Sequence, residues 1–315
     1  MEANKTVERL KNEISKHLIG KEEEVELMFI SLLFNGHVLM ESVPGTGKTM
    51  LAKKFAEAVG GVFSRIQFTP DVLPGDITGI RFFNPKKQEF ELLQGPIMAN
   101  IVLADEINRA TPRTQSSLLE AMEEKQVTID GYTLALDRPF MVIATQNPVE
   151  SQQGTFPLPA AQMDRFFIKL QAFYPELEEE RRILQLHRGG TRSLEVKQVI
   201  TKEELLALAK EASETAISHD VETYILEVAR KTREHSLIEL GASPRGTIAM
   251  MRAAQGKAFV SGRSFVDPDD VKAVAPYVLG HRLQLTTEGS LTRTPEAIMT
   301  EILESVPVPV EKGAG

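Results

Sequence analysis

A glycine-rich loop between a predicted strand and a predicted helix constrains this chain more than any other feature. Residues 42–49 read Ser-Val-Pro-Gly-Thr-Gly-Lys-Thr and follow a predicted strand at 37–41, while residues 48–59 carry apolar side chains at helical spacing. In a phosphate-binding loop, backbone N–H groups surround the phosphates, the lysine contacts the β and γ oxygens, and the hydroxyl residue contacts Mg²⁺. Lys48 and Thr49 occupy those two positions. The helix also directs its positive dipole end at the phosphates, so the sequence predicts a nucleotide site.

Ser42 is the one position of the loop that departs from the phosphate-binding pattern, which has glycine there. Because Gly45 and Gly47 remain, we expect the cradle of N–H groups to keep its shape. The predicted nucleotide contacts run through the whole loop into the first turn of the helix: Ser42, Val43, Pro44, Gly45, Thr46, Gly47, Lys48, Thr49 and Met50.

Two adjacent acids follow a second predicted strand. The apolar residues 101–104 run into Asp105 and Glu106, and a continuous apolar run is typical of a parallel strand buried on both faces. Ligands of such sheets bind at the carboxyl ends of the strands. We therefore assign Asp105 to Mg²⁺, held through water, and Glu106 to catalysis, where it polarises the attacking water. The alternative is that the acids simply begin a solvated loop, and the phosphate-binding loop upstream argues against it.

The composition is that of an ordinary globular protein, with 25% charged and 42% hydrophobic residues among 315. We find no apolar run of the ~18 residues needed to span a membrane and no signal peptide, so we predict a cytoplasmic protein. The sequence contains no cysteine, which excludes disulfides and cysteine-based metal sites. Its net charge of −8 argues against a protein whose main activity is coating nucleic acid.

Strands alternate with helices in the first half of the chain, which predicts an α/β fold with a mostly parallel five-stranded sheet. After two helices in residues 1–36, broken at Ile19-Gly20, we expect strands at 37–41, 62–67, 101–105, 140–145 and 166–169, and helices at 48–59 and 115–124. Two β-hairpins are predicted as insertions, one around Asn84-Pro85 and one around the type I′ dipeptide Asp130-Gly131.

Helical patterns dominate the second half of the chain, at residues 176–188, 202–216, 220–236, 244–262 and 268–280. We therefore predict a nucleotide-binding α/β domain at 1–174, an α-helical lid domain at 175–305 and a flexible tail at 306–315. The tail is rich in proline and glycine, which disfavour regular structure.

Several long segments resemble the MoxR family of AAA+ ATPases, and the resemblance covers nearly the whole chain. In order, these segments are Gln67 to Asp71 with Asp76 to Gly79, Gly95 to Ala110, Thr111 to Glu124, Ala144 to Pro148, Phe156 to Phe166, and Gly241 to Arg245. The resemblance implies a P-loop AAA+ domain followed by a helical lid, with ATP and Mg²⁺ as the cofactors.

The resemblance also implies roles for residues outside the loop. Asn147 would be the sensor 1 residue that positions the attacking water, although an asparagine before Pro148 is also an ordinary turn residue. Ile19 and Gly20 would contact the adenine, and their alternative role is a turn between helices. Both assignments place residues from distant parts of the chain at one nucleotide.

Arginines complete the site that the resemblance implies. Arg165 would be the arginine finger, inserted into the site of the next subunit, and its alternative role is a surface ion pair with Asp164. Arg245 would be sensor 2, in the first turn of a helix where a bound phosphate offsets the unfavourable dipole. Arg109 and Arg113 are weaker candidates for contacts across a subunit boundary.

The predicted function is Mg²⁺-dependent ATP hydrolysis in a homo-oligomeric ring, hexameric by resemblance, that remodels or activates a partner protein. Relatives of this kind act with proteins that carry von Willebrand factor A domains. Two alternatives remain at this point: a motor stimulated by nucleic acid, and a non-catalytic nucleotide switch. The first hairpin, which mixes Phe82 and Phe83 with Lys86 and Lys87, would grip a polymer or pack its apolar face on the core.

Overall fold

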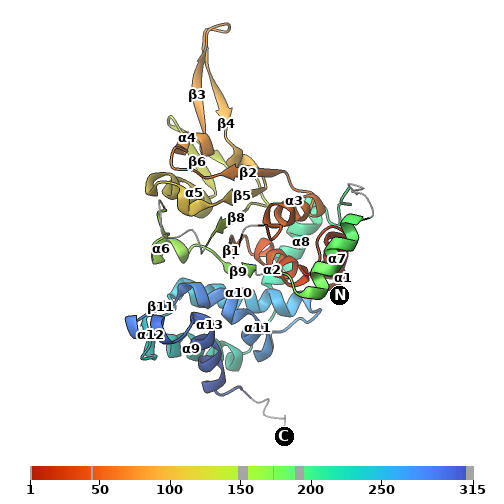
Figure 1. The fold of residues 1–315 in the computed structure, drawn as a ribbon, viewed down its shortest axis with the longest axis vertical. Coiled ribbons are helices and arrows are strands. Elements are labelled where there is room, and N and C mark those ends of the chain that lie inside the picture. Colours follow the sequence, from red (N-terminus) through yellow and green to blue (C-terminus); the bar gives the residue numbers. More distant parts are fainter. Residues whose placement is uncertain (1, 44, 148–154, 173, 189–194, 310–315) are drawn as a thin grey trace.

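A five-stranded parallel sheet forms the centre of the computed structural model, which describes residues 2–43, 45–147, 155–172, 174–188 and 195–309 (Figure 1). The strand order is β2-β5-β8-β1-β9, and every neighbouring pair is parallel. The strands are β1 (Val38–Ser42), β2 (Phe63–Gln67), β5 (Ile101–Asp105), β8 (Met141–Gln146) and β9 (Ile168–Ala172). This confirms the predicted fold class, although the last strand begins two residues later than residue 166.

Both faces of the sheet are buried, which explains why its central strands are continuous apolar runs. Val38 and Leu103 face one core and Leu39 and Val102 face the other, because successive side chains of a strand point to opposite faces. The first core is covered by α1 (Glu2–Ser15), α2 (Glu22–Leu33), α3 (Lys48–Ala58) and C-terminal helices, and the second by α4 (Pro74–Thr78), α5 (Pro112–Glu124) and short connections.

One helix boundary and several short elements in this half differ from the predictions. The helix predicted to begin at residue 115 begins at Pro112, because Thr111 takes the N-cap position and proline is favoured at the first helical position. The short helix α4 and the 3₁₀ turns η1 (Pro96–Met98) and η2 (Ile107–Arg109) were not predicted. Elements this short bury too few side chains to give a periodic pattern.

Both predicted hairpins are present. Strands β3 (Gly79–Asn84) and β4 (Glu89–Gln94) pair antiparallel and project away from the sheet, as the orange arrows of Figure 1 show. Strands β6 (Gln126–Ile129) and β7 (Tyr132–Ala135) form the second hairpin. Its turn residues Asp130 and Gly131 have φ of 46° and 84°, the positive values that a type I′ turn requires.

The C-terminal part is helical, as predicted, and contains elements that the sequence did not reveal. Its helices are α7 (Leu177–Arg188), α8 (Lys202–Ser213), α9 (His219–Glu234), α10 (Pro244–Val260), α11 (Pro268–Leu279), α12 (Thr287–Thr292) and α13 (Pro295–Ser305), after α6 (Ala160–Met163). The unpredicted elements are α6, α12, α13, the turn η3 (Gly280–Arg282) and a two-stranded sheet of β10 (Ile238–Leu240) and β11 (Gln284–Leu285). No helix among the described residues is both long and apolar enough to cross a membrane.

One buried core runs from the N-terminal helices into the lid helices. Leu10, Phe29, Met250 and Val274 all belong to it, so the helices on either side of residue 175 share a single apolar interior. The domain division at residue 174 stays a prediction. Val306, assigned to the tail, is buried in this core, and residues 310–315 of the tail lie outside the described part.

His37, just before β1, gives the fold a pH dependence. Its Nδ1 accepts a hydrogen bond from the Val142 N–H at 3.0 Å, so Nε2 carries the proton and donates to the Met122 carbonyl at 3.1 Å. Burial lowers the pKa of His37 to about 4. Since an unfolded histidine titrates near 6.5, the unfolded chain binds more protons between these two pH values.

The free energy of unfolding is therefore expected to fall by about 3 kcal/mol from this residue as pH falls from about 6.5 to 4. Urea unfolding across that range measures the slope. His37→Gln should lower stability at neutral pH but flatten the slope, whereas His219→Gln, at an exposed position, should change neither. An unchanged slope in His37→Gln would show that other groups cause the acid sensitivity.

Candidate nucleotide site and the arginines outside it

The loop between β1 and α3 presents backbone N–H groups at the start of α3. Gly45 and Gly47 have φ of 84° and 82°, in the left-handed region that favours glycine, and Thr46 Oγ1 donates to the Val43 carbonyl at 3.1 Å. Among the described residues, no side chain caps α3 and no acid lies in its first turn. The helix N-terminus, which carries Lys48 and Thr49, is therefore suited to an anion such as phosphate.

The described part covers all but one of the predicted loop residues. The backbone of Ser42 lies in β1 and pairs with Ala172. Pro44 lies outside the described residues.

Asp105 and Glu106 stand at the carboxyl end of β5, as predicted. Asp105 is buried, and its Oδ1 accepts a hydrogen bond of 2.6 Å from Thr145 Oγ1. Its Oδ2 forms an ion pair with Arg65, at 2.6 Å from Nη2. Thr145 also accepts from the Glu106 N–H at 2.9 Å, so one hydroxyl fixes both acids.

Glu106 adopts a left-handed conformation with φ of 59°, a strain of about 1–3 kcal/mol that proteins keep mainly at functional positions. Its Oε2 accepts from Gln67 Nε2 at 2.9 Å and forms an ion pair with Arg109 Nε at 3.2 Å. Arg65 and Gln67 were not predicted to belong to the site. They could have been found from their position at the end of β2, because β2 pairs with β5 and so ends beside the two acids.

Asn147 lies at the same edge of the sheet as the acids. It follows β8 directly and is buried. Because β8 lies between β1 and β5, Asn147 is positioned between the phosphate-binding loop and the two carboxylates. The parallel sheet therefore brings the loop, Asp105, Glu106 and Asn147 to one place, since the carboxyl ends of parallel strands share an edge.

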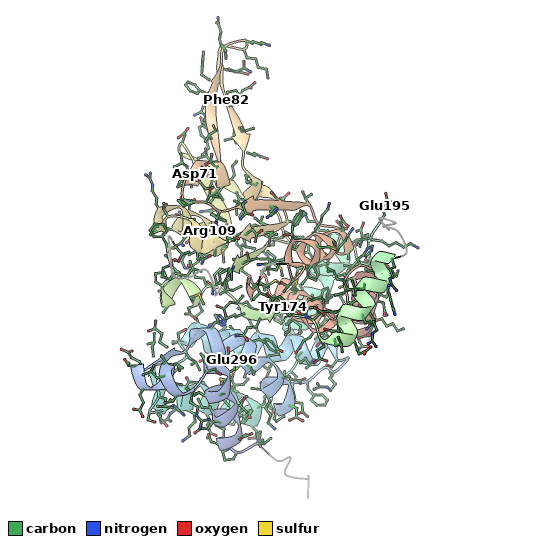
Figure 2. The ribbon with its side chains drawn as sticks, in the orientation of Figure 1. Asp71, Phe82, Arg109, Tyr174, Glu195 and Glu296 are labelled. Carbon is green, nitrogen blue, oxygen red and sulfur yellow. The ribbon has the colours of Figure 1, made fainter. Side chains whose placement is uncertain are left out.

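A cavity of about 710 Å³ begins at the loop and extends toward the N-terminal helices. It is lined by the predicted residues Ile19, Gly20, Gly45, Thr46, Gly47 and Met50. Tyr174, labelled in Figure 2, and Tyr277 add aromatic rings to the lining and were not predicted. The volume lies within the range of ligand pockets, and the apolar and aromatic lining suits a flat base.

The oxygen groups at this edge fit a magnesium ion. Thr49 supplies a hydroxyl in the first turn of α3, and Asp105 supplies a carboxylate. The described residues contain no group of three or more histidines and acids that would enclose a metal by itself. Mg²⁺ suits such a sparse donor set, because it keeps water ligands and takes one or two protein groups together with phosphate oxygens.

Arg165 and Arg245 lie away from this cavity and close to each other. They line a second cavity of about 260 Å³, whereas the described lining of the first includes neither. Both bind Glu123 at the end of α5: Arg165 Nε lies 3.1 Å from Oε2, and Arg245 Nη2 lies 2.5 Å from Oε1. Arg165 and Arg245, which are far apart in the sequence, therefore share one carboxylate. No pattern within either segment predicted that the two arginines would meet.

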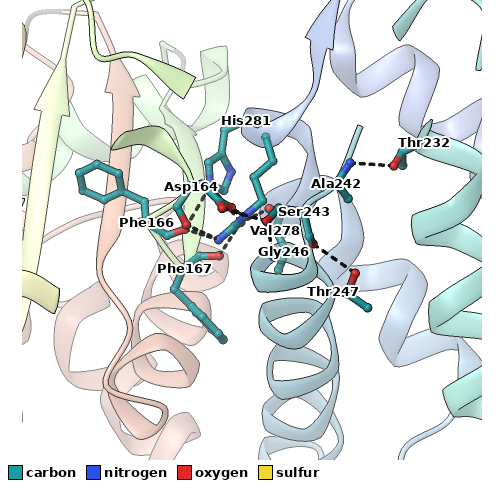
Figure 3. Close-up of polar contacts among 11 residues, drawn as sticks. Asp164, Phe166, Phe167, Thr232, Ala242, Ser243, Gly246, Thr247, Val278 and His281 are labelled. Carbon is teal, nitrogen blue, oxygen red and sulfur yellow. Dashed lines mark hydrogen bonds and ion pairs between the residues drawn. The ribbon is translucent and has the colours of Figure 1, made fainter. Parts of the chain in front are cut away.

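Asp164 does not form the ion pair with Arg165 that was the alternative role of that arginine. Asp164 Oδ1 pairs with Arg282 Nε at 2.7 Å, and Oδ2 accepts from Ser243 Oγ at 2.8 Å (Figure 3). Ser243 is also the N-cap of α10, where its Oγ accepts from the Gly246 N–H. Arg282 is buried and donates to the Phe166 carbonyl at 2.5 Å. This network therefore joins the C-terminal helices to the segment just before β9.

Loss of the Arg282 guanidinium should destabilise the protein strongly. Arg282→Met removes the cation that pairs with the Asp164 carboxylate and one donor to the Phe166 carbonyl, and breaking a buried pair costs about 3 kcal/mol or more. Urea unfolding measures the loss. Arg230→Met is a matched control, because the Arg230–Glu234 pair is exposed and should contribute less than about 1 kcal/mol. Equal losses in both variants would contradict a clamp role for Arg282.

The first hairpin exposes aromatic side chains instead of packing them on the core. Phe82, Phe83 and Phe90 are 40%, 51% and 61% exposed, and Figure 2 shows Phe82 on the projecting strands. The alternative of a core-packed hairpin is therefore wrong. Arg81 places its guanidinium 5.2 Å from the centre of the Phe90 ring and 4.7 Å from that of Tyr132. These cation–π contacts connect the first hairpin to the second, to which Tyr132 belongs.

Comparison with known proteins agrees with this architecture. Residues 37–168 match the model of the ATPase family associated with various cellular activities (AAA), and residues 230–302 match the AAA lid domain. The protein YeaC of Bacillus subtilis, which is uncharacterised, is 48% identical over 96% of this chain and 94% of its own length. Chaperone MoxR1 of Mycobacterium tuberculosis is 42% identical over 96% of this chain and 82% of its own length.

A solved structure has the same fold over nearly its whole length. The crystal structure of a candidate ATPase from Cytophaga hutchinsonii superposes with a TM-score of 0.91 at 37% identity, covering 98% of this chain and 96% of that one. The α/β domain and the helical lid thus have the architecture of a solved structure that is described as an ATPase. This chain belongs to the MoxR family of AAA+ ATPases.

Proposed function

We propose that this protein binds ATP with Mg²⁺ and hydrolyses it in a head-to-tail ring of six copies, and that the cycle remodels or activates a partner protein. One observation carries the proposal. Lys48, Asp105, Glu106 and Asn147 belong to one edge of the sheet, whereas Arg165 lines a different cavity. The groups proposed for hydrolysis therefore lie at one edge of a single copy, and Arg165 lies at a different cavity.

Each residue at the edge has a role in this reaction. The α3 N-terminus and Lys48 hold the phosphates. Thr49 and, through water, Asp105 would hold Mg²⁺, which neutralises charge on the phosphate oxygens. Glu106 accepts the proton of the attacking water, and the Asn147 amide orients that water beside it. Gln67 and Arg109 hold the Glu106 carboxylate in place until then.

A neighbouring copy supplies the remaining positive charge. Arg165 and Arg245, side by side on Glu123, would contact the γ-phosphate of the next copy, where charge develops during transfer. Each copy would use one surface to insert its arginines and a different surface to accept those of its neighbour, which makes the interface heterologous. Heterologous interfaces produce rings when the rotation between copies closes.

The partner is proposed to be a protein, in keeping with the name of the relative Chaperone MoxR1. Exposed phenylalanines on the first hairpin suit an apolar polypeptide segment. Nucleic acid is less well matched, because Arg81 is stacked on rings and Lys87 is paired with Glu91. The family resemblance suggests a partner with a von Willebrand factor A domain, and we place the complex in the cytoplasm.

Steady-state ATPase activity per subunit over a wide range of protein concentration tests the proposal. With Mg²⁺ present, activity per subunit should rise with concentration and then reach a plateau, because each site is completed by a neighbour. Lys48→Ala should be inactive throughout, which excludes a contaminating ATPase. Activity that stays constant while the protein remains monomeric would disprove the ring mechanism, and a lack of turnover in assembled rings would favour a nucleotide switch.

A further inference from the structure

A third cavity carries only positive charge. It has a volume of about 630 Å³ and lies between the end of α2, α8 and α10. Its charged lining residues are Lys125, Arg138, Lys210 and Arg252, and no acid lines it within the described part of the chain. Arg138, Lys210 and Arg252 are exposed and Lys125 is half-buried. We call this cavity the cationic groove.

The like charges of the cationic groove repel one another. Burial, together with Arg138 and Arg252, lowers the pKa of Lys125, and no carboxylate in the described residues forms an ion pair with any of the four cations. An anionic group placed in the groove would relieve this repulsion. The apolar walls, formed by residues such as Leu205, Leu206 and Met251, favour a protein surface over a free ion.

The cationic groove is continuous with the pair of arginines proposed to act on the next copy. Arg252 lines both the groove and the cavity of Arg165 and Arg245. On α10, Arg245 and Arg252 are seven residues apart, so they lie on one face of the helix two turns from each other. Any copy contacted by Arg165 and Arg245 is thus brought close to the groove.

The nucleotide cavity has the opposite charge. Five carboxylates line it, from Glu22, Glu23 and Glu24 in the first turn of α2 and from Glu176 and Glu179 around the start of α7, against the single lysine Lys21. We call these five residues the acidic rim. An acidic rim disfavours the entry of a polyanion such as ATP, and cations brought close to it would lower that cost.

We propose that the cationic groove of one copy docks on the acidic rim of the next copy's nucleotide cavity. This inference rests on the proposed function, because it names the surfaces through which the ring closes and the arginines enter the neighbouring site. The occupant is a second copy of this chain, since the same chain carries both complementary surfaces and the groove adjoins Arg165 and Arg245. Assembly would then favour ATP binding by partly neutralising the rim.

Two charge-reversed variants test the pairing. The groove variant carries Lys125→Glu, Arg138→Glu and Lys210→Glu, and the rim variant carries Glu22→Lys, Glu23→Lys and Glu176→Lys. Sedimentation velocity with a non-hydrolysable ATP analogue measures self-association, so hydrolysis is not needed. Each variant alone should associate about tenfold or more weakly than the wild type, because like charges then face each other. An equimolar mixture should associate again, since every contact in an alternating ring pairs opposite charges.

The control variant Lys231→Glu/Arg293→Glu changes exposed cations on the lid, outside the groove and the rim, and should associate like the wild type. Circular dichroism checks folding. If a triple variant does not fold, the single exposed substitutions Arg138→Glu and Glu22→Lys replace it, with a smaller effect expected. Wild-type association should also weaken as salt rises, because exposed charges are screened.

Three results would overturn the docking proposal: no association of the wild type at any concentration, unchanged association of both variants, or a mixture that stays dissociated although both variants fold. The ATPase assay distinguishes these from failure of the proposed function. If the wild type assembles, the charge-reversed variants behave as expected and no ATP is hydrolysed, the docking proposal is supported and the hydrolytic role is disproved.

Discussion

Glu106→Gln is expected to bind ATP and to lose turnover by about 10²–10⁴-fold, the usual contribution of a general base. Glutamine can keep the hydrogen bond with Gln67 but cannot accept the proton of water. The substitution therefore removes the general base and keeps the size and contacts of the side chain. Fluorescence titration with a labelled ATP analogue measures binding, and phosphate release measures turnover. The affinity for the ATP analogue should be nearly unchanged, whereas almost no phosphate should be released.

A matched control makes the result specific. Glu211→Gln changes the same atoms at an exposed position of α8, outside the lining of the nucleotide cavity, and should turn over ATP like the wild type. Normal hydrolysis by Glu106→Gln would remove Glu106 from the reaction. Loss of ATP binding in that variant would instead indicate that the strained turn at Glu106 supports the loop.

Arg165→Ala is expected to reduce turnover by about 10³–10⁵-fold, the range observed for arginines that stabilise charge on a transferred phosphoryl group. The substitution leaves Lys48, Asp105 and Glu106 intact, so ATP should still bind. Since Arg165 lines a different cavity from the nucleotide, the lost group should be replaceable by another copy.

Mixing experiments test that replacement. Lys48→Ala lacks a working nucleotide site but keeps Arg165, whereas Arg165→Ala keeps the site but lacks the arginine. Each should be inactive alone, and a mixture should regain activity at those interfaces where the two variants meet in the right order. A mixture that forms rings and stays inactive would show that Arg165 acts within its own copy or not at all. Arg245→Ala, measured in the same way, shows whether the second arginine bound to Glu123 shares the role.

The sequence by itself determined the nucleotide edge of this protein. Lys48, Asp105 and Asn147 each follow an apolar run that forms a strand, and parallel strands deliver their carboxyl ends to one edge whatever the rest of the fold does. The type I′ turn at Asp130-Gly131 was equally predictable, because both residues must adopt positive φ. In these cases the physical cause acts over a few residues, so a local pattern is sufficient.

Only the tertiary structure decided which distant side chains meet. Arg165 and Arg245 converge on Glu123, Arg282 is buried against Asp164, and Arg65 pairs with Asp105. The cationic groove likewise gathers residues from the end of α2, α8, α10, the residue after α5 and a loop before β8. Contacts of this kind depend on how helices pack over a shared core, and packing is set by side-chain shape across the whole interior, so no periodicity within one segment encodes them.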